Sequence, residues 1–498
     1  MTTTTVASPQ GGPEEARTGL ARWEPAELPE PPRPRGLGWL GVVGPGVIVL
    51  GASIGSGEFL LGPAVFVRYG LTMMWVTACA AFLQTIFNTE LMRYTLATGE
   101  PATSGFMRTK PHATFWAWVY ALLYFLQIGW PAWAGSAAGA FFFLFTKRLA
   151  GATDASVIYW IGVGLFLVCV AVLLVGRRIE RTLEVLNWVL ITCILSGFAL
   201  LALRFVPGET WLAAVTGLAG WSPTDGRFML IPEGGDFFLI GALAAFSGAG
   251  GVINITLSNW ARDRGYGMGA RAGYIAAAAG GEQRDVAHSG FRFEATAASM
   301  ERWRGWWRVV RADQWGIFFV GALLGMILPG VLYVTFLTPG SDIRGYGIAA
   351  ALAQAVVGTG APILGGVVAF IGAWILFKTQ LDLVEGLSRA ITDILWTGSS
   401  RVRGWRGGDV RRVYYSVLGV VVVWGVIALR LAQPIFLLQV AANVGGVVFV
   451  LASLHLLYVN TVLLPAHVRP PMWRRVGLVA VAIFYGGFVS LWIRGLLA

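Results

Sequence analysis

A single carboxylate, Glu58, interrupts a run of small and apolar residues long enough to cross a membrane. It ends the sequence Gly55-Ser56-Gly57-Glu58, with apolar stretches on both sides. An acid at mid-depth in a bilayer is costly unless it has a partner or a function. We therefore expect Glu58 to coordinate a metal ion, receive an ammonium group or take up a proton. Ser56 is a second oxygen donor that a metal would find there.

A second glycine cluster lies in a later apolar run. It reads Ser247-Gly248-Ala249-Gly250-Gly251, and Asn254 follows. A break in a membrane helix at mid-depth survives only where protein or a polar cavity satisfies the freed backbone groups. Close helix packing is the alternative reading, because glycines also line helix contacts in membranes. We predict a substrate site formed by both breaks, with these residues: Gly55, Ser56, Gly57, Glu58, Ser247, Gly248, Gly250, Gly251 and Asn254.

Other polar residues in apolar runs are candidates for ion coupling. Lys378, Asp382, Glu385 and Arg389 share one helical face at spacings of four, three and four residues. They either pair with one another, Lys378 with Asp382 and Glu385 with Arg389, or line a route for ions or protons. The same choice applies to the remaining candidates: Glu90, Arg93, Gln439 and Asn443. For His455 we expect a structural hydrogen-bonding role.

The elements that must position these residues are membrane helices. Of the 498 residues, 56% are hydrophobic and 13% charged, too few charges to coat a soluble globule of this size. Runs of roughly 20 apolar residues predict about eleven transmembrane helices in an all-α polytopic protein. The expected spans are 38–66, 71–98, 115–146, 156–176, 183–206, 237–257, 314–337, 361–396, 412–431, 433–464 and 474–496.

The distribution of charge sets the expected orientation. A net charge of +11 suggests nucleic-acid binding only where basic residues share one soluble face, and here they sort by loop. Basic loops such as the one holding Arg469, Arg474 and Arg475 mark the cytosolic side, so the N-terminus is expected in the cytosol. We predict a multi-pass protein of the cell inner membrane or plasma membrane. No cofactor, disulfide or nucleic-acid partner is expected, and the oligomeric state stays open.

Three regions follow from composition. Residues 1–36, rich in Thr and Pro, are expected to be a disordered cytosolic tail. Residues 37–498 are expected to form one transmembrane domain, with 258–313 as a cytosolic loop within it. Trp303, Trp306 and Trp307 lie at helical spacing beside arginines, which predicts an interfacial helix at headgroup level.

The first and sixth spans, which hold the two breaks, are five spans apart. This spacing is typical of two inverted five-helix repeats, each beginning with a discontinuous helix. Residues 38–464 resemble the Nramp family of divalent-metal transporters, which implies a LeuT-type fold. The resemblance rests on Gly44-Pro45-Gly46, the broken element, Tyr69-Gly70, Trp75, Thr98-Gly99 and Arg411-Arg412.

Most of the metal ligands that the resemblance implies are replaced by other residues in this sequence. The family's Asp-Pro-Gly-Asn motif aligns with Gly55-Ser56-Gly57-Glu58, which keeps only the glycine. Its Met-Pro-His element falls on 250–253, where none of the three residues is present, although Asn254 matches the asparagine that follows. Residues 115–146 contain no carboxylate, whereas the family places proton-route acids there. The pattern therefore argues against proton coupling.

Three functions remain in view. The first is transport by alternating access of a hard divalent cation such as Mg²⁺ or Mn²⁺, held by Glu58, Ser56 and freed carbonyl groups. The second is transport of a small organic solute, an amino acid or amine, on the same fold. The third is a membrane receptor that transports nothing and docks a partner on 258–313. Enzymatic activity is not expected, because the sequence has no nucleophile motif or phosphate-binding loop.

Overall fold

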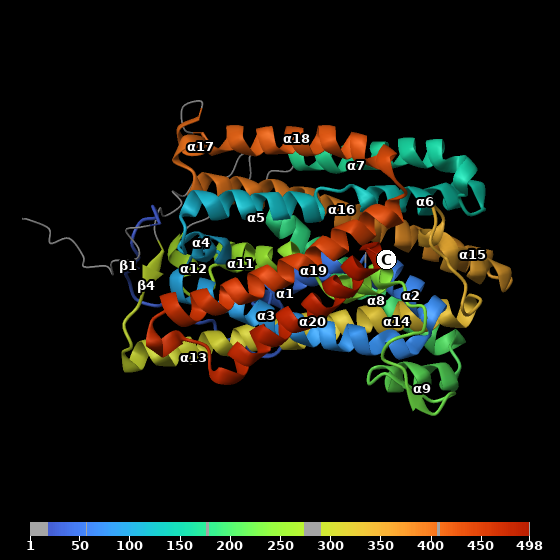
Figure 1. The fold of residues 1–498 in the computed structure, drawn as a ribbon, viewed down its shortest axis with the longest axis horizontal. Coiled ribbons are helices and arrows are strands. Elements are labelled where there is room, and N and C mark those ends of the chain that lie inside the picture. The colour runs from blue at the N-terminus through green and yellow to red at the C-terminus, as the bar shows by residue number, and fades with distance from the viewer. Residues whose placement is uncertain (1–17, 56, 176–178, 273–289, 406–408, 498) are drawn as a thin grey trace, which may run out of the picture.

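Long, roughly aligned helices form the body of the protein in a computed structural model that describes residues 18–55, 57–175, 179–272, 290–405 and 409–497. Figure 1 shows β1 (Glu24–Pro25), β4 (Phe291–Arg292) and α17 (Ser400–Gly404) at one end of the bundle. At the opposite end lie α9 (Gly208–Gly217) and α15 (Ala351–Gly358). We call these the β1 end and the α9 end.

The first half of the chain carries the first break and the helices that surround it. Its elements are η2 (Gly36–Gly41), α1 (Pro45–Ser53), η3 (Gly57–Leu61), α2 (Gly62–Tyr69), η4 (Leu71–Met73), α3 (Met74–Thr98), α4 (Ala102–Met107), α5 (Ala113–Ile128), α6 (Ala132–Thr146), η5 (Ala152–Asp154), α7 (Ala155–Val175) and α8 (Ile179–Phe205). After α9 comes a hairpin of two short antiparallel strands, β2 (Trp221–Ser222) and β3 (Arg227–Phe228).

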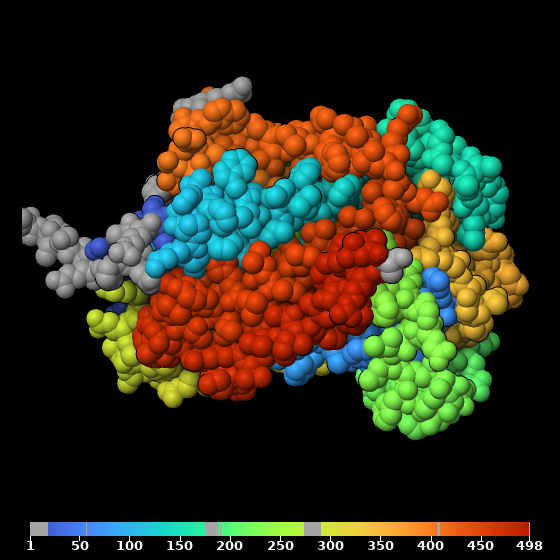
Figure 2. Space-filling view, in the orientation of Figure 1, coloured from blue at the N-terminus to red at the C-terminus, as the bar shows by residue number. Residues whose placement is uncertain are grey.

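The second half begins with the second break. Its elements are α10 (Phe237–Phe246), α11 (Val252–Asp263), α12 (Gly269–Ala272), α13 (Ala297–Arg311), η6 (Ala312–Phe319), α14 (Val320–Phe336), η7 (Ile348–Ala350), α16 (Pro362–Gly398), α18 (Val410–Leu431), α19 (Pro434–Tyr458), η9 (Val459–Leu463), η10 (Ala466–Val468) and α20 (Met472–Leu497). In Figure 2, α19 and α20 fill the middle of one face, and the segment around α9 projects from a corner.

The all-α membrane class is confirmed, but the count of eleven spans is not. Among the described residues, nine helices are long and apolar enough to cross a membrane. The two remaining predicted spans, 183–206 and 237–257, are also helical. The first lies within α8 except for its last residue, and the second consists of α10 and α11, each too short to span alone.

Both predicted breaks are present. The first helix ends at Ser53, and the chain resumes at Gly57 in a π-helical turn, η3, that runs into α2. The sixth stops at Phe246 and resumes at Val252. Discontinuous first and sixth helices are therefore confirmed.

The N-terminal segment corrects one expectation. Residues 18–35 are not a free tail: Trp23 and Leu28 are buried, and β1 pairs in parallel with β4. The Trp306 indole donates to the Pro29 carbonyl at 2.9 Å, which fastens the segment to α13. The prediction of disorder from composition failed here because the few apolar residues of the segment pack against a surface formed by distant parts of the chain. Residues 1–17 of the predicted tail lie outside the described residues.

The predicted interfacial helix is also revised. α13, η6 and α14 form one continuous helical stretch, Ala297–Phe336, so α13 is the end of the seventh span. Trp303, Trp306 and Trp307 are buried in the protein, and the guanidinium groups of Arg93 and Arg474 stack on the Trp307 ring. The helical spacing was correct, but the surface that the tryptophans cover is protein and not lipid headgroups. Residues 273–289 of the 258–313 segment are outside the described residues.

Candidate functional site

Glu58 lies in the π-helical turn that follows the first break. Glu58 is 1% exposed, and its carboxylate has no side-chain hydrogen-bond partner among the described residues; the polar groups near it are the backbone amides of Gly55 and of Glu58 itself. An unpaired buried carboxylate is expensive, because burial removes water without replacing it. Glu58 is therefore the strongest candidate for meeting a bound cation or proton. Ser56, its predicted companion, lies outside the described residues.

One face of the first helix follows η6 and α14 closely. The Gly46 amide donates to the Asp313 carboxylate at 2.9 Å. Further along, a Cβ at Gly321 would lie 2.2 Å from Leu50, and one at Gly325 would lie 3.1 Å from Cγ of Glu58. Gly46 and Leu50 are four residues apart on α1, and Ile54 and Glu58 both approach Gly325 of α14, so these contacts form one seam. The seam places the Glu58 side chain against α14.

The second break is held open by two glutamines from neighbouring helices. Gln84 of α3 donates to the carbonyls of Ala245 and Ser247 at 3.1 and 3.3 Å, and accepts from the Ala249 amide at 2.9 Å. Gln127 of α5 accepts from the Val252 amide at 2.9 Å and donates to the Gly250 carbonyl. The side chains of this chain therefore satisfy many of the backbone groups that the break frees.

Glycine is required in this break by its backbone angles. Gly248, Gly250 and Gly251 have φ of 131°, 81° and 60°, a region that residues with a Cβ rarely adopt. The Ser247 hydroxyl contacts Thr77 at 3.1 Å, and Asn254 donates to Asn88 at 2.8 Å. These predicted site residues thus face α3.

The two breaks come close together where Gly57 passes the end of α10. A Cβ at Gly57 would lie 1.7 Å from the Phe246 carbonyl oxygen, so that no larger residue fits there. On the other side, Gly55 lies against α16, where a Cβ would be 2.6 Å from the Thr379 hydroxyl. The structure therefore brings Gly57 next to the end of α10 and Gly55 next to α16.

The predicted coupling residues pair with one another. Lys378 bonds to Asp382, and Arg389 donates to Glu385 at 2.6 Å, both within α16. Arg389 also reaches Asp263 of α11 at 3.5 Å, while Arg262 bonds Asp393 at 3.0 Å. The first of our two interpretations, internal pairing, describes this geometry, and the pairs also join α11 to α16.

The other polar candidates lie elsewhere in the bundle. Glu90 bonds Arg93 at 2.8 Å and Arg474 at 3.0 Å. Asn443 donates to the Phe238 carbonyl at 2.8 Å and lies beside Gln439 on α19. His455 contacts the hydroxyls of Thr109 and Tyr120 at 2.7 and 3.0 Å, which is the structural role expected of it.

Sequence reasoning missed the residues that support the site. Gln84, Gln127, Asp313 and Gly325 each touch a break or the helix that leads to it. An uncharged amide within an apolar run was the available signal for the two glutamines, because such a side chain needs partners in a membrane. Nothing in the local sequence marks Gly325.

The donor set around Glu58 is sparse for a metal. Among the described residues, no group of three or more His, Cys, Asp or Glu side chains is placed to hold an ion. The Met326 side chain does approach the turn that holds Glu58. A Cβ at Gly62 would lie 2.9 Å from its Sδ, and a Cβ at Gly57 would lie 3.1 Å from its methyl group. One carboxylate, backbone carbonyls and a nearby thioether suit an ion that keeps part of its water shell.

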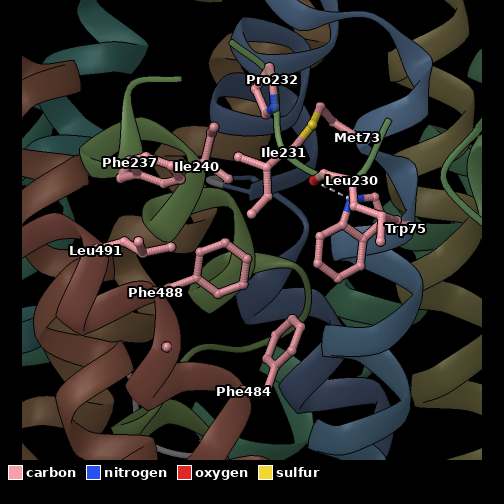
Figure 3. Close-up of a pocket in the computed structure, with 11 residues that line it drawn as sticks. Met73, Trp75, Leu230, Ile231, Pro232, Phe237, Ile240, Phe484, Phe488 and Leu491 are labelled. Carbon is pink, nitrogen blue, oxygen red and sulfur yellow. Dashed lines mark hydrogen bonds between the residues drawn. The ribbon is translucent and has the colours of Figure 1, made fainter. Parts of the chain in front are cut away.

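An apolar pocket of about 530 Å³ lies at the α9 end, away from the breaks. Figure 3 shows Trp75 of α3 facing Phe484 and Phe488 of α20 across it, with the loop around Leu230 as a wall. The Trp75 indole donates to the Leu230 carbonyl at 2.9 Å. None of the site residues predicted from the sequence lines this pocket.

Comparison with known proteins supports the resemblance. A scan against models of protein families found no match. The divalent metal cation transporter MntH of Chromohalobacter salexigens is 28% identical over 170 residues, which span 34% of this chain and 37% of that protein. The chain thus matches little more than a third of this curated relative's length.

Solved structures extend the likeness over the whole fold. The manganese transporter of Eremococcus coleocola, solved with an aromatic bis-isothiourea compound, gives a TM-score of 0.60 at 15% identity, over 94% of this chain and 90% of that one. A point mutant of the same transporter gives 0.63 at 14% identity, over 98% and 92%. The chain therefore shares the fold of this manganese transporter, at low sequence identity.

Proposed function

We propose that this divergent Nramp-like chain is a secondary transporter that moves a divalent metal cation across a membrane by alternating access. The observation that carries the proposal is the buried carboxylate of Glu58, which has no side-chain partner among the described residues and lies beside the meeting point of the two breaks. A hard ion such as Mg²⁺ or Mn²⁺, partly hydrated, fits a site of few oxygen donors. The names of the similar proteins, a divalent metal cation transporter and a manganese transporter, support the same class of cargo.

The alternative cargo, an amino acid or amine, is less well supported. A substrate carboxylate would need free backbone amides at the start of α11. The amides of Ala249 and Val252 already donate to Gln84 and Gln127. An organic solute would therefore have to displace two buried side-chain amides.

The receptor alternative loses its main support. It relied on the tryptophans of 258–313 being available to a partner protein. Trp303, Trp306 and Trp307 are buried within the chain itself. A docking role would have to use other residues of that segment.

Orientation follows from charge. Basic side chains concentrate around the β1 end: Arg33, Arg35, Arg304, Arg308, Arg401, Arg403, Arg411 and Arg412. By the positive-inside rule the β1 end faces the cytosol, together with the N-terminus, in a plasma membrane or a bacterial inner membrane.

Cation titrations of the purified full chain test the proposal. We expect Mg²⁺ or Mn²⁺ to bind wild type and the Glu209→Gln control, which removes an exposed acid on α9, with equal affinity. Glu58→Gln should bind at least tenfold more weakly and lose uptake into proteoliposomes. Equal divalent binding to wild type and Glu58→Gln would show that Glu58 is not the ligand. Binding of amino acids without divalent binding would favour the organic cargo.

A further inference from the structure

A groove of about 1030 Å³ opens at the β1 end between the proline-rich segment before α1 and the outer side of α13. Arg33 and Arg35 lie on one wall, and Arg302 and Arg308 on the other. The two walls contact each other where Gly305 of α13 packs against Pro31, since a Cβ at Gly305 would lie 2.5 Å from the Pro31 ring. Together with the bond from Trp306 to the Pro29 carbonyl, this contact makes the groove a fixed part of the fold.

The groove carries an excess of positive charge. Four arginines line it against two acids, Glu30 and Glu301. Arg302 is engaged with Glu30 at 2.7 Å. Arg35 and Arg308 are exposed, and neither forms an ion pair with any described residue. Two uncommitted guanidinium groups on opposite walls suit a phosphate, which arginine binds through paired N–H donors.

Exposed leucines continue from the groove toward the membrane. η2 follows Arg35 directly, and Leu37 and Leu40 on it are 84% and 48% exposed. Trp39, between them, lines the groove. Because η2 immediately precedes α1, the first spanning element, we expect these leucines to lie where headgroups meet acyl chains. An apolar element beside an arginine groove at that depth matches a molecule with a charged head and apolar tails.

We propose that this groove binds the headgroup of an anionic phospholipid, with the phosphate between Arg35 and Arg308 and an acyl chain against Leu37 and Leu40. A lipid there would fasten the N-terminal segment to α13. The electrostatic attraction of an anionic leaflet for basic residues at its surface favours the same placement.

The test is lipid-dependent thermal unfolding of the purified full chain in detergent. Phosphatidylglycerol should raise the unfolding temperature by several degrees more than phosphatidylcholine with the same acyl chains. The double variant Arg35→Gln/Arg308→Gln should lose most of that difference. Arg304→Gln is the matched control, because Arg304 is exposed on the same helix but does not line the groove. It should behave as wild type does.

The other outcomes overturn the proposal. No preference for phosphatidylglycerol in wild type, or an unchanged preference in the double variant, would show that the groove holds no anionic lipid. An equal loss in Arg304→Gln would indicate diffuse charge attraction. Glycerol phosphate that stabilised wild type as well as the lipid does would identify a site for free anions. The double variant Leu37→Ser/Leu40→Ser should weaken stabilisation by the lipid but leave any effect of glycerol phosphate unchanged.

Discussion

Gly325 lies directly against the Glu58 side chain, at the point where the first span passes α14 on its way through the bundle. A Cβ there would come within 3.1 Å of Glu58 Cγ and 3.6 Å of Ile54 Cγ1. The absence of a side chain at 325 lets the carboxylate sit within the seam. The position of the only acid in the first span is therefore set by a glycine far away in the sequence.

Replacing Gly325 by alanine should weaken cation binding without unfolding the protein. The added methyl group presses on the Glu58 stem, which can shift by a few tenths of an ångström but carries its carboxylate with it. We expect several-fold weaker binding of Mg²⁺ or Mn²⁺ in a titration. Gly316→Ala is the control, because nothing lies within 4 Å of a Cβ at Gly316. Unchanged affinity in Gly325→Ala would mean that the ion does not depend on this position of Glu58.

Gln84→Leu should destabilise the fold more than any surface change. Leucine keeps the volume but leaves the Ala249 amide and the carbonyls of Ala245 and Ser247 without their partner. Each buried group left unpaired costs about 1–3 kcal/mol. Thermal unfolding in detergent should show a clear drop for Gln84→Leu and little change for Gln354→Leu, an exposed position on α15. Similar unfolding temperatures would show that the break needs no support from α3.

The sequence predicted the breaks because their signals are local. Glycines at 248, 250 and 251 mark backbone conformations that few other residues adopt, and those at 55 and 57 mark close approaches of other helices. The charged residues of α16 stand at spacings that determine which of them pair. A membrane span is likewise encoded within one run of apolar residues. These features need no knowledge of the rest of the chain.

What the sequence could not predict depends on contacts between distant segments. Gln84 and Gln127 reach the second break across more than 120 residues, as the separations of 161 and 125 between bonded residues show. Trp303 and Trp307 have the same spacing whether lipid or protein covers them. Their burial follows from contacts with distant segments: Trp303 packs against Phe293, and Arg93 and Arg474 cover Trp307.

Met326 provides a test of the ion's softness. Its thioether lies against Gly57 and Gly62, next to Glu58, and sulfur prefers soft ions. If a hard ion is the cargo, Met326→Leu should leave the affinity for Mg²⁺ and Mn²⁺ within about twofold, since leucine conserves volume. Competition by Cd²⁺ in the same titration reports on direct sulfur coordination. A large loss of both Mn²⁺ and Cd²⁺ binding in Met326→Leu would place sulfur among the ligands and count against a hard-ion site.

Docking of the N-terminal segment should depend on the ionisation of Glu100, which lies outside the spans. Its carboxylate accepts from Trp23 at 3.2 Å, from Arg108 at 2.9 Å and from the Gly290 amide at 2.9 Å. Burial raises the pKa of Glu100, but the charge of Arg108 and these donors outweigh it, so the pKa lies below its ordinary value. Because the pKa of Glu100 is lowered in the docked state, its ionisation stabilises docking at pH values above the ordinary pKa of glutamate. This stabilisation is lost as the pH falls through the lowered pKa.

A spin label on the segment can follow this loss. Ala21→Cys, in a background with the native cysteines replaced, places the label at an exposed site two residues from Trp23. We expect slow label motion at neutral pH and faster motion as the pH falls below about 4.5, the ordinary value for glutamate. Glu100→Gln should show faster motion at neutral pH and no change over this range, because the amide carries no charge for Arg108 to stabilise. An identical acid transition in wild type and Glu100→Gln would assign the release to another group.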